Sequence, residues 1–138
     1  MDLHWSAGFV GIPFAELGRT REGADCWGLA CVVYRERMGV DLPQYQGAYV
    51  SVSERQEIAA LIERVTATSA WRTVKAVHRP FDICVFRRGR LGSHVGVVIE
   101  AGRMLHMVED GQSRIEDYRS PRWAAKLAGV YRHRILGM

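Results

Sequence analysis

One change in the spacing of apolar residues limits what this chain can fold into. Up to about residue 67 the apolar residues fit helices, and after Trp71 they form short, strand-like runs separated by glycine and proline. A helical first half followed by a strand-rich second half favours an α+β layer fold, with a helix packed on an antiparallel β-sheet. No internal repeat or Ser/Pro-rich linker interrupts the 138 residues, so residues 1–138 are expected to form a single domain.

Two helices are predicted in the first half. Residues 25–38 form the first, with Asp25 as its N-cap and Gly39 as its C-terminal stop. Because this segment is apolar on more than one side, we expect it to be a central, buried helix. Residues 53–67 form the second helix, which opens with a capping box and then shows apolar residues at helical spacing.

Six strand-like runs follow in the second half, with turn-prone residues between several of them. This arrangement is typical of an antiparallel meander. The predicted strands are residues 72–77, 83–87, 94–100, 104–109, 114–118 and 129–135.

Charge and cysteine content disfavour several other classes of protein. Three cysteines, none in a Cys-x-x-Cys pair, predict neither a disulfide framework nor a thiolate zinc site. The net charge of +4 comes from scattered basic residues, with residues 87–90 the one dense cluster, so solubility explains it more simply than nucleic-acid binding. Residues 1–13 lack the layout of a secretory signal, and no apolar run approaches the roughly 18 residues that a membrane helix needs. The sequence therefore predicts a protein made in the cytoplasm without a signal peptide and without membrane insertion.

Cys26 is the residue best placed for nucleophilic chemistry. It lies in the first turn of the predicted helix, where backbone amides and the positive end of the helix dipole favour a thiolate. The alternative for any free cysteine is burial as a small apolar residue. We expect that alternative for Cys31 in the middle of the helix and for Cys84 inside an apolar strand.

A thiolate nucleophile needs a base that also protonates the leaving amine, and histidine is the usual choice near neutral pH. His4, His78 and His133 lie in the N-terminal arm, in a loop and near the C-terminus, where surface or local hydrogen-bonding roles are favoured. His94 differs because it opens a strand-like run, and Gly96 in that run leaves room for a helix or a substrate to approach closely.

His106 lies in the next predicted strand, after a short turn around Ala101 and Gly102. Because strand side chains alternate between faces, an odd-numbered loop or a bulge would bring His106 diagonal to His94 on one face. A strict two-residue loop would put them on opposite faces. An active site built on both imidazoles therefore predicts an odd loop or a bulge, and otherwise His106 is a half-buried strand residue.

Several short motifs occur in an order characteristic of one peptidase family. They are Gly11-Ile12-Pro13-Phe14, Gly18-Arg19, Asp25-Cys26-Trp27-Gly28-Leu29, Phe81-Asp82-Ile83-Cys84-Val85-Phe86, Ser93-His94-Val95-Gly96-Val97 and Met104-Leu105-His106. From about residue 10 to about residue 131 the chain resembles the NlpC (p-sixty) family of papain-like cell-wall peptidases. Within that family it looks closest to single-domain proteins encoded among phage tail genes and in gene-transfer-agent clusters.

The resemblance implies a papain-like fold with Cys26 as nucleophile, His94 as general base and acid, and His106 as the third residue that orients His94. The Cys26 backbone amide would contribute to the oxyanion hole. In this family the bond hydrolysed joins D-glutamate to diaminopimelate, or to a related amino acid, in peptidoglycan stem peptides, and no cofactor or metal is needed. The residues that would contact the substrate are Phe14, Asp25, Trp27 and Ser93.

Two positions depart from the family's common pattern. Phe14 stands where members commonly have a tyrosine whose hydroxyl helps to polarise the scissile carbonyl, a donor that contributes a few kcal/mol in oxyanion sites. Tyr34, Tyr45 and Tyr49 are the candidates to replace it. Trp27 stands where a small residue commonly follows the nucleophile, and it is either a substrate platform or packs against a neighbouring loop or a partner subunit.

Three explanations of this pattern stay open. The first is an active peptidoglycan endopeptidase carried by a phage or phage-like tail, which would deliver it to the periplasm or cell wall among other tail-tip or baseplate proteins. The second is a structural tail-tip component that keeps the peptidase fold with weak or no activity. The third is a wall-degrading toxin delivered by a contractile secretion machine. A zinc protein built from His94, His106 and a cysteine is disfavoured, because the spacing matches no closed zinc site.

Overall fold

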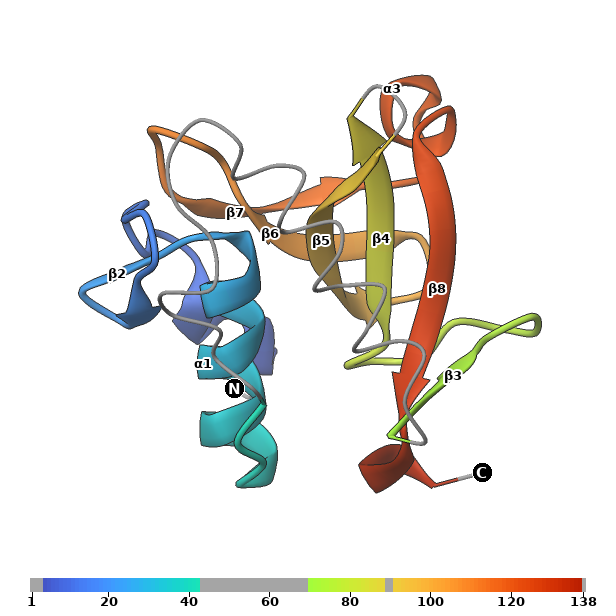
Figure 1. Ribbon diagram of the computed structural model, residues 1–138, viewed down its shortest axis with the longest axis horizontal. Coiled ribbons are helices and arrows are strands. Elements are labelled where there is room, and N and C mark those ends of the chain that lie inside the picture. The colour runs from blue at the N-terminus through green and yellow to red at the C-terminus, as the bar shows by residue number, and fades with distance from the viewer. Residues whose placement is uncertain (1–3, 43–69, 89–90, 138) are drawn as a thin grey trace.

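The chain is organised around a six-stranded antiparallel sheet with helix α1 (Cys26–Met38) against one face (Figure 1). A computed structural model describes residues 4–42, 70–88 and 91–137. The strands lie in the order β3 (Trp71–Thr73), β8 (Leu127–His133), β4 (Ile83–Arg88), β5 (Leu91–Glu100), β6 (Arg103–Met107) and β7 (Ser113–Asp117). The smaller elements are η1 (Trp5–Phe9), β1 (Arg19–Thr20), β2 (Gly23–Ala24), α3 (Pro121–Ala124) and η3 (Arg134–Leu136).

The predicted strands are present, but the meander is incomplete. Strands β4 to β7 follow one another as expected, whereas β8 lies between β3 and β4 and pairs with both. The first predicted strand, residues 72–77, is shorter in the structure, where β3 covers Trp71–Thr73 at the edge of the sheet and pairs with β8. The last predicted strand ends at His133, where the chain turns into η3.

Helix α1 begins and ends where its capping residues predict. Asp25 Oδ1 accepts a hydrogen bond from the Gly28 amide at 2.7 Å, and Gly39 adopts the left-handed φ of 66° that suits glycine. All residues from Trp27 to Tyr34 are buried, which confirms a central helix. The second predicted helix, residues 53–67, lies outside the described residues.

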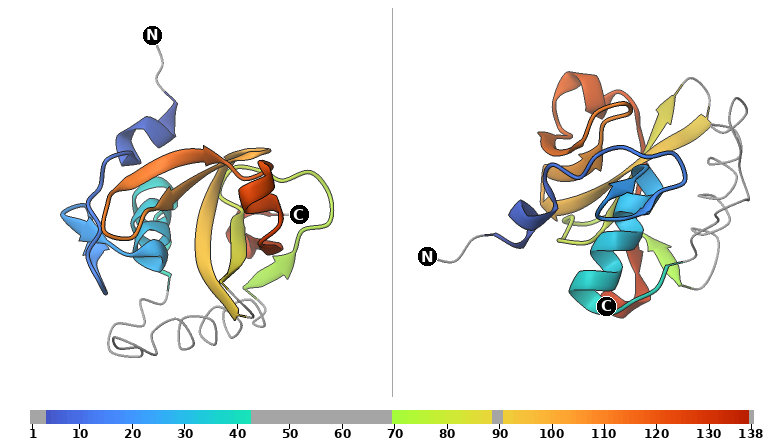
Figure 2. Two further views of the ribbon diagram at one scale, coloured as in Figure 1. Left: turned by 90° about the horizontal axis from the view of Figure 1, so that it is seen from above. Right: turned by 90° about the vertical axis from the view of Figure 1, so that its left-hand side faces the viewer.

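Two apolar clusters occupy the two faces of the sheet. Val85 and Val97 belong to the cluster that contains α1, whereas Phe86 and Val98 belong to the cluster that contains Trp123 of α3. This division follows from the alternation of side chains along β4 and β5. Figure 2 shows α1 and α3 on opposite sides of the sheet.

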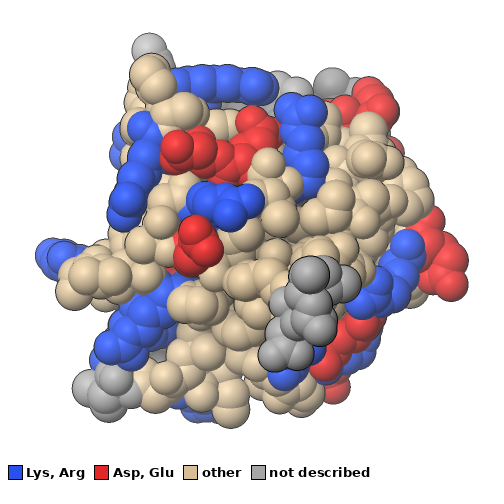
Figure 3. Space-filling view, turned by 180° about the vertical axis from the view of Figure 1, so that it is seen from behind, with Lys and Arg blue, Asp and Glu red and all other residues tan. Residues whose placement is uncertain are grey.

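The surface mixes charges of both signs. On the face drawn in Figure 3, lysine and arginine side chains lie beside aspartate and glutamate side chains around an uncharged area. On that face the basic residues do not merge into one patch, as their scatter along the sequence indicates. In the described part of the chain, no helix is both long enough and apolar enough to cross a membrane.

Candidate active site

Cys26 is the first residue of α1, and its side chain is half-buried. Asp25, the residue before Cys26, fixes the start of the helix through its side chain. The Asp25 carboxylate accepts hydrogen bonds from the Gly28 amide at 2.7 Å, the Leu17 amide at 3.2 Å and the Arg19 guanidinium at 2.8 Å. The Arg19 and Asp25 side chains are 3% and 5% exposed. Asp25 is one of the predicted substrate contacts, and here both of its carboxylate oxygens bind groups of the protein itself.

A close backbone approach explains the glycine of the Asp-Cys-x-Gly motif. A Cβ atom on Gly28 would lie 1.9 Å from the carbonyl oxygen of Gly18, well inside the contact distance of the two atoms. Arg19 donates a hydrogen bond to the same carbonyl at 2.8 Å. The loop before Cys26 therefore packs directly on the first turn of α1, and any side chain at Gly28 would push the two apart.

The structure brings His94 and His106 together. Strands β5 and β6 pair in one register where Gly96 faces His106, and in a shifted register beside the turn, where Glu100 faces Arg103. The shift is a bulge of one residue, and it returns His106 to the face that carries His94. His94 Nε2 lies 3.0 Å from His106 Nδ1. The predicted bulge is confirmed.

Aromatic rings enclose the two imidazoles. The Trp123 ring of α3 stacks on His94 with centroids 5.5 Å apart and planes inclined by 22°, and it meets His106 edge-on at 5.0 Å. Phe86 of β4 contributes a second ring, 6.1 Å from His94. His94 and His106 are 4% and 2% exposed, so this is a buried pair held by packing as well as by hydrogen bonding.

Glu116 of β7 adds a further polar group that the sequence analysis did not single out. Its Oε2 atom lies 2.5 Å from His106 Nε2 and accepts from Arg114 Nε at 3.0 Å, while Trp123 Nε1 donates to Oε1 at 3.2 Å. Burial alone would raise the pKa of the Glu116 carboxyl, but these hydrogen bonds lower it to about 2. Burial lowers the pKa of His106, and the hydrogen bond to Glu116 opposes that shift. At neutral pH an ionised carboxylate thus faces a neutral imidazole.

The other cysteines belong to the core, as predicted. Cys31 and Cys84 are 2% and 0% exposed. Burial raises the pKa of Cys31 to about 12 and also raises the pKa of Cys84, which keeps both as thiols at neutral pH. Within residues 4–42, 70–88 and 91–137, no group of three or more His, Cys, Asp or Glu side chains is arranged to hold a metal ion.

The remaining histidines make local contacts. The His4 imidazole caps η1 by accepting from the Ser6 amide at 3.2 Å. His78 Nδ1 lies 2.6 Å from the Tyr118 hydroxyl, and His133 accepts from the backbone amide two residues on, at 3.1 Å. These contacts agree with the local roles that the sequence favours for these three residues.

The other predicted substrate contacts have varied surroundings. Trp27 is 4% exposed and packs in the α1 cluster, and Phe14 is half-buried against the same cluster. Ser93 lies on β5, and its side chain is outside the described part of the structure. The space expected beside Gly96 for a helix or a substrate is instead filled by Met104, whose Sδ would lie 2.5 Å from a Cβ at that glycine. That expectation was wrong because β6 packs its own side chain there.

Tyr34 does not replace the tyrosine missing at position 14. It is fully buried in α1, and its hydroxyl donates a hydrogen bond to the Phe81 carbonyl in the core. Burial also raises the pKa of the Tyr34 phenol. Tyr45 and Tyr49, the other candidates, lie outside the described residues.

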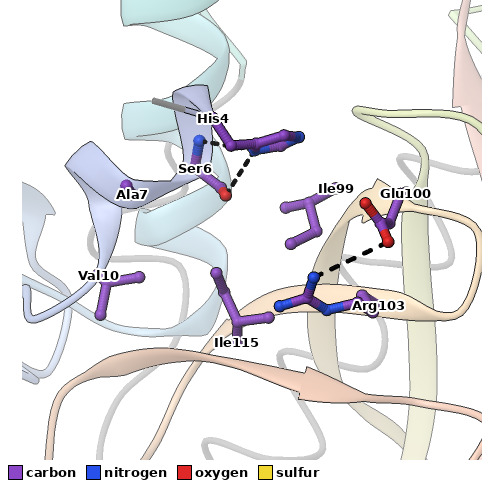
Figure 4. A pocket seen from close by; sticks show the side chains of 8 residues that line it. All are labelled: His4, Ser6, Ala7, Val10, Ile99, Glu100, Arg103 and Ile115. Carbon is purple, nitrogen blue, oxygen red and sulfur yellow. Dashed lines mark hydrogen bonds and ion pairs between the residues drawn. The ribbon is translucent and has the colours of Figure 1, made fainter. Parts of the chain in front are cut away.

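A hollow of about 450 Å³ lies between η1 and the strands β5 to β7 (Figure 4). Its polar side chains bind one another: His4 lies 2.7 Å from Ser6 and Arg103 lies 3.8 Å from Glu100. None of its lining residues is Cys26, His94 or His106, so this hollow is separate from the predicted catalytic residues. The lining residues are His4, Ser6, Ala7, Val10, Ile99, Glu100, Arg103 and Ile115.

The cysteine at the start of α1 and the histidine pair on adjacent strands agree with the family resemblance of the sequence motifs. The profile of the NlpC/P60 family matches residues 11–132, which is most of the chain. The chain belongs to the NlpC/P60 family. Cys26, His94 and His106 all lie inside the matched region of this NlpC/P60 domain.

Similar proteins support the same assignment. The NlpC/P60 domain is 27% identical over 117 residues to Murein DD-endopeptidase MepS/Murein LD-carboxypeptidase of Escherichia coli (strain K12), a match that covers 85% of the chain and 53% of that relative. The chain therefore spans about half the length of the curated relatives it matches.

Solved structures show the same fold. The NlpC/p60 domain of the peptidoglycan hydrolase SagA aligns with a TM-score of 0.60 at 16% identity, over 91% of this chain and 90% of that one. NlpC2 from Trichomonas vaginalis aligns with a TM-score of 0.67 at 16% identity, over 92% of this chain and 44% of that one. The predicted α+β, papain-like fold of the NlpC type is confirmed.

Proposed function

We propose that this NlpC/P60 domain is a cysteine peptidase that hydrolyses amide bonds in the stem peptides of peptidoglycan. The observation that carries the proposal is the 3.0 Å contact between His94 Nε2 and His106 Nδ1, made possible by the bulge in β5. A general base needs a fixed ring orientation, and a hydrogen bond to its second nitrogen provides one. The relatives named as murein endopeptidase and peptidoglycan hydrolase support the substrate class.

The proposed reaction follows the triad chemistry of cysteine peptidases. Cys26 Sγ attacks the scissile carbonyl carbon, and its proton passes to His94 Nδ1, because His106 engages the other nitrogen. The oxyanion accepts a hydrogen bond from the Cys26 backbone amide, which lies at the N-terminal end of α1. His94 then gives its proton to the leaving amine, and water hydrolyses the resulting thioester.

Three bonds of the peptidoglycan peptides are candidates for cleavage. The family resemblance favours the bond between D-glutamate and diaminopimelate, and we propose that bond as the substrate. The Escherichia coli relative is named a DD-endopeptidase and an LD-carboxypeptidase, so the cross-link and the terminal bond of the stem peptide belong in the same assay.

We also propose that a phage or phage-like tail carries the domain to the periplasm or cell wall, with tail-tip or baseplate proteins as partners. Support comes from the resemblance of its motifs to those of tail-encoded family members. Immunolabelling of purified particles from the host would test this: label at the tail tip supports carriage, and particles without label contradict it.

The decisive test of the activity is hydrolysis of purified stem peptides and cross-linked peptidoglycan, with products identified by mass spectrometry. We expect the wild type to cleave and the variants Cys26→Ala and His94→Ala to lose at least about 10³-fold in rate. His4→Gln is the matched control, because it changes an imidazole that caps η1. Absence of wild-type cleavage, together with slow alkylation of Cys26 by iodoacetamide near neutral pH, would refute the peptidase and favour a structural tail-tip component.

A further inference from the structure

A row of polar contacts crosses three adjacent strands and ends on a carboxylate. His94 on β5 meets His106 on β6 at 3.0 Å, and the far nitrogen of His106 meets Glu116 on β7 at 2.5 Å. Glu116 faces Met104 across the β6–β7 pair, which puts it diagonal to His106. The triad proposed above uses the two histidines and leaves the role of this carboxylate open.

The chemistry of these groups determines where each hydrogen lies. An ionised carboxylate only accepts hydrogen bonds, so the contact with Glu116 requires the hydrogen of neutral His106 to be on Nε2. His106 Nδ1 then carries a lone pair, and His94 Nε2 must be the donor across their 3.0 Å contact. In neutral His94 the lone pair is consequently on Nδ1, the nitrogen that the proposed reaction uses as the base.

Several donors hold the carboxylate in this orientation. Trp123 Nε1 donates to one oxygen, and Arg114 Nε donates to the other, beside His106. The Trp123 ring also stacks on His94, so one side chain positions both ends of the row. The charged groups that act on His106 are Glu116 and Arg114 on β7 and Arg122 on α3, and the two arginines offset part of the carboxylate's effect.

We propose that Glu116 is a positioning residue of this peptidase: its carboxylate fixes the Nε2–H tautomer of His106 and, through it, the Nε2–H tautomer of His94. The catalytic role that this inference gives to Glu116 rests on the proposed function. The tautomers of His106 and His94 do not depend on a bound substrate. When His94 Nδ1 takes the thiol proton of Cys26, the imidazolium keeps its Nε2 hydrogen, and the row of dipoles ending at Glu116 stabilises the new positive charge.

Nitrogen-15 NMR of the whole chain with labelled histidine tests the tautomers directly. In the wild type above about pH 7 we expect both rings as Nε2–H tautomers. In Glu116→Gln the amide also donates hydrogen bonds, so we expect His106 and His94 to populate a mixture. Glu116→Asp keeps a group that only accepts, and it is expected to retain the wild-type tautomers. Glu100→Gln, which removes an exposed carboxylate from the same sheet, is the matched control.

Two results of this NMR experiment would overturn the proposal. One is a wild-type spectrum with either ring in the Nδ1–H form, which needs no variant to fold. The other is a folded Glu116→Gln protein whose tautomers equal those of the wild type.

Alkylation of Cys26 by iodoacetamide supplies a kinetic measurement that needs no peptidoglycan. We expect Glu116→Gln to react at least about tenfold more slowly near pH 7, because the imidazolium that accompanies the thiolate is less stable. Near about pH 10 the difference should vanish, since the thiol then ionises without help from His94. Equal rates at pH 7 would contradict the proposal. A wild type that does not cleave peptidoglycan would refute the proposed function, while the tautomers and alkylation rates would still decide the role of Glu116.

Discussion

The two sides of the candidate site are built in different ways. On the Cys26 side the contacts join near neighbours in the chain: Asp25 binds Arg19 and the Leu17 amide, and Gly28 packs on Gly18. On the histidine side the main contacts join different elements, since His94, His106, Glu116 and Trp123 come from β5, β6, β7 and α3. The first side depends on a short loop and the second on the register of a sheet.

Substitutions on the two sides should therefore affect different properties of the protein. A buried ion pair and a backbone close approach leave little room for change, so alterations on the Cys26 side should act on stability. Glu116 is 21% exposed, and water can partly replace a lost partner there. Alterations on the histidine side should therefore affect proton positions more than folding.

The largest effect is expected from Arg19→Met. The change leaves the buried Asp25 carboxylate without its cationic partner, which typically destabilises a protein by about 3–5 kcal/mol. We expect the midpoint of urea unfolding, followed by circular dichroism, to fall accordingly.

Arg21→Met is the matched control for that change. Arg21 pairs with Glu36 at 2.7 Å, but both side chains are substantially exposed, and such surface pairs contribute about 0–1 kcal/mol. Equal losses of stability in the two variants would contradict the view that burial makes the Arg19 pair important.

Gly28→Ala should have the next largest effect. A methyl group there meets the Gly18 carbonyl oxygen, so the loop and the helix must separate at a cost of about 1–3 kcal/mol. Because Cys26 lies in the same helical turn, its alkylation rate should also change. Gly8→Ala is the control, since no atom lies within 4 Å of a Cβ there, and matching unfolding midpoints for the two variants would refute the steric explanation.

The Cys26 side was predictable from the sequence because its causes are local. Asp25 as a cap, Cys26 at the helix start and Gly39 as a stop each follow from the residue type at one end of a single helical segment. The core positions of Cys31 and Cys84 follow from apolar neighbours in the same way.

The histidine side was predictable only in part, because strand register and strand order arise from tertiary packing. The alternation of strand side chains was enough to predict an odd loop or a bulge between His94 and His106, and the bulge is present. No local motif in the sequence marks Glu116 or Trp123 as their partners. The signal for Glu116 is its position on β7, two residues from Arg114, the partner of His106, and that position is visible only once the pairing is known. The insertion of β8 beside β4 is likewise a product of packing, which the spacing of turns does not encode.

Acid should weaken the histidine side through Glu116. Its folded-state pKa of about 2 lies below the ordinary value of 4.5, so its contribution to stability is complete above about pH 4.5 and is lost as the pH falls toward 2. We expect the wild type to exceed Glu116→Gln by about 1–2 kcal/mol at pH 6 and by progressively less at pH 4 and pH 3, measured as urea midpoints. A difference that stays constant with pH would contradict an ionised, hydrogen-bonded carboxylate.

The smallest expected effect is the coupling between the two sides, and it tests whether they are separate. Glu116→Gln removes the charge of the acceptor and Trp123→Phe removes the donor of one hydrogen bond, so their effects on unfolding should deviate from additivity by about 0.5–1.5 kcal/mol. Glu116→Gln and Gly28→Ala share no contact in the structure, so their effects should add to within about 0.5 kcal/mol. Both double-mutant cycles are measured by urea unfolding at one pH, and the Glu116→Gln variant is common to the two. A coupling across the site as large as the one within the histidine side would mean that the loop before Cys26 and the three strands respond as one unit, and that Cys26 and His94 are positioned together.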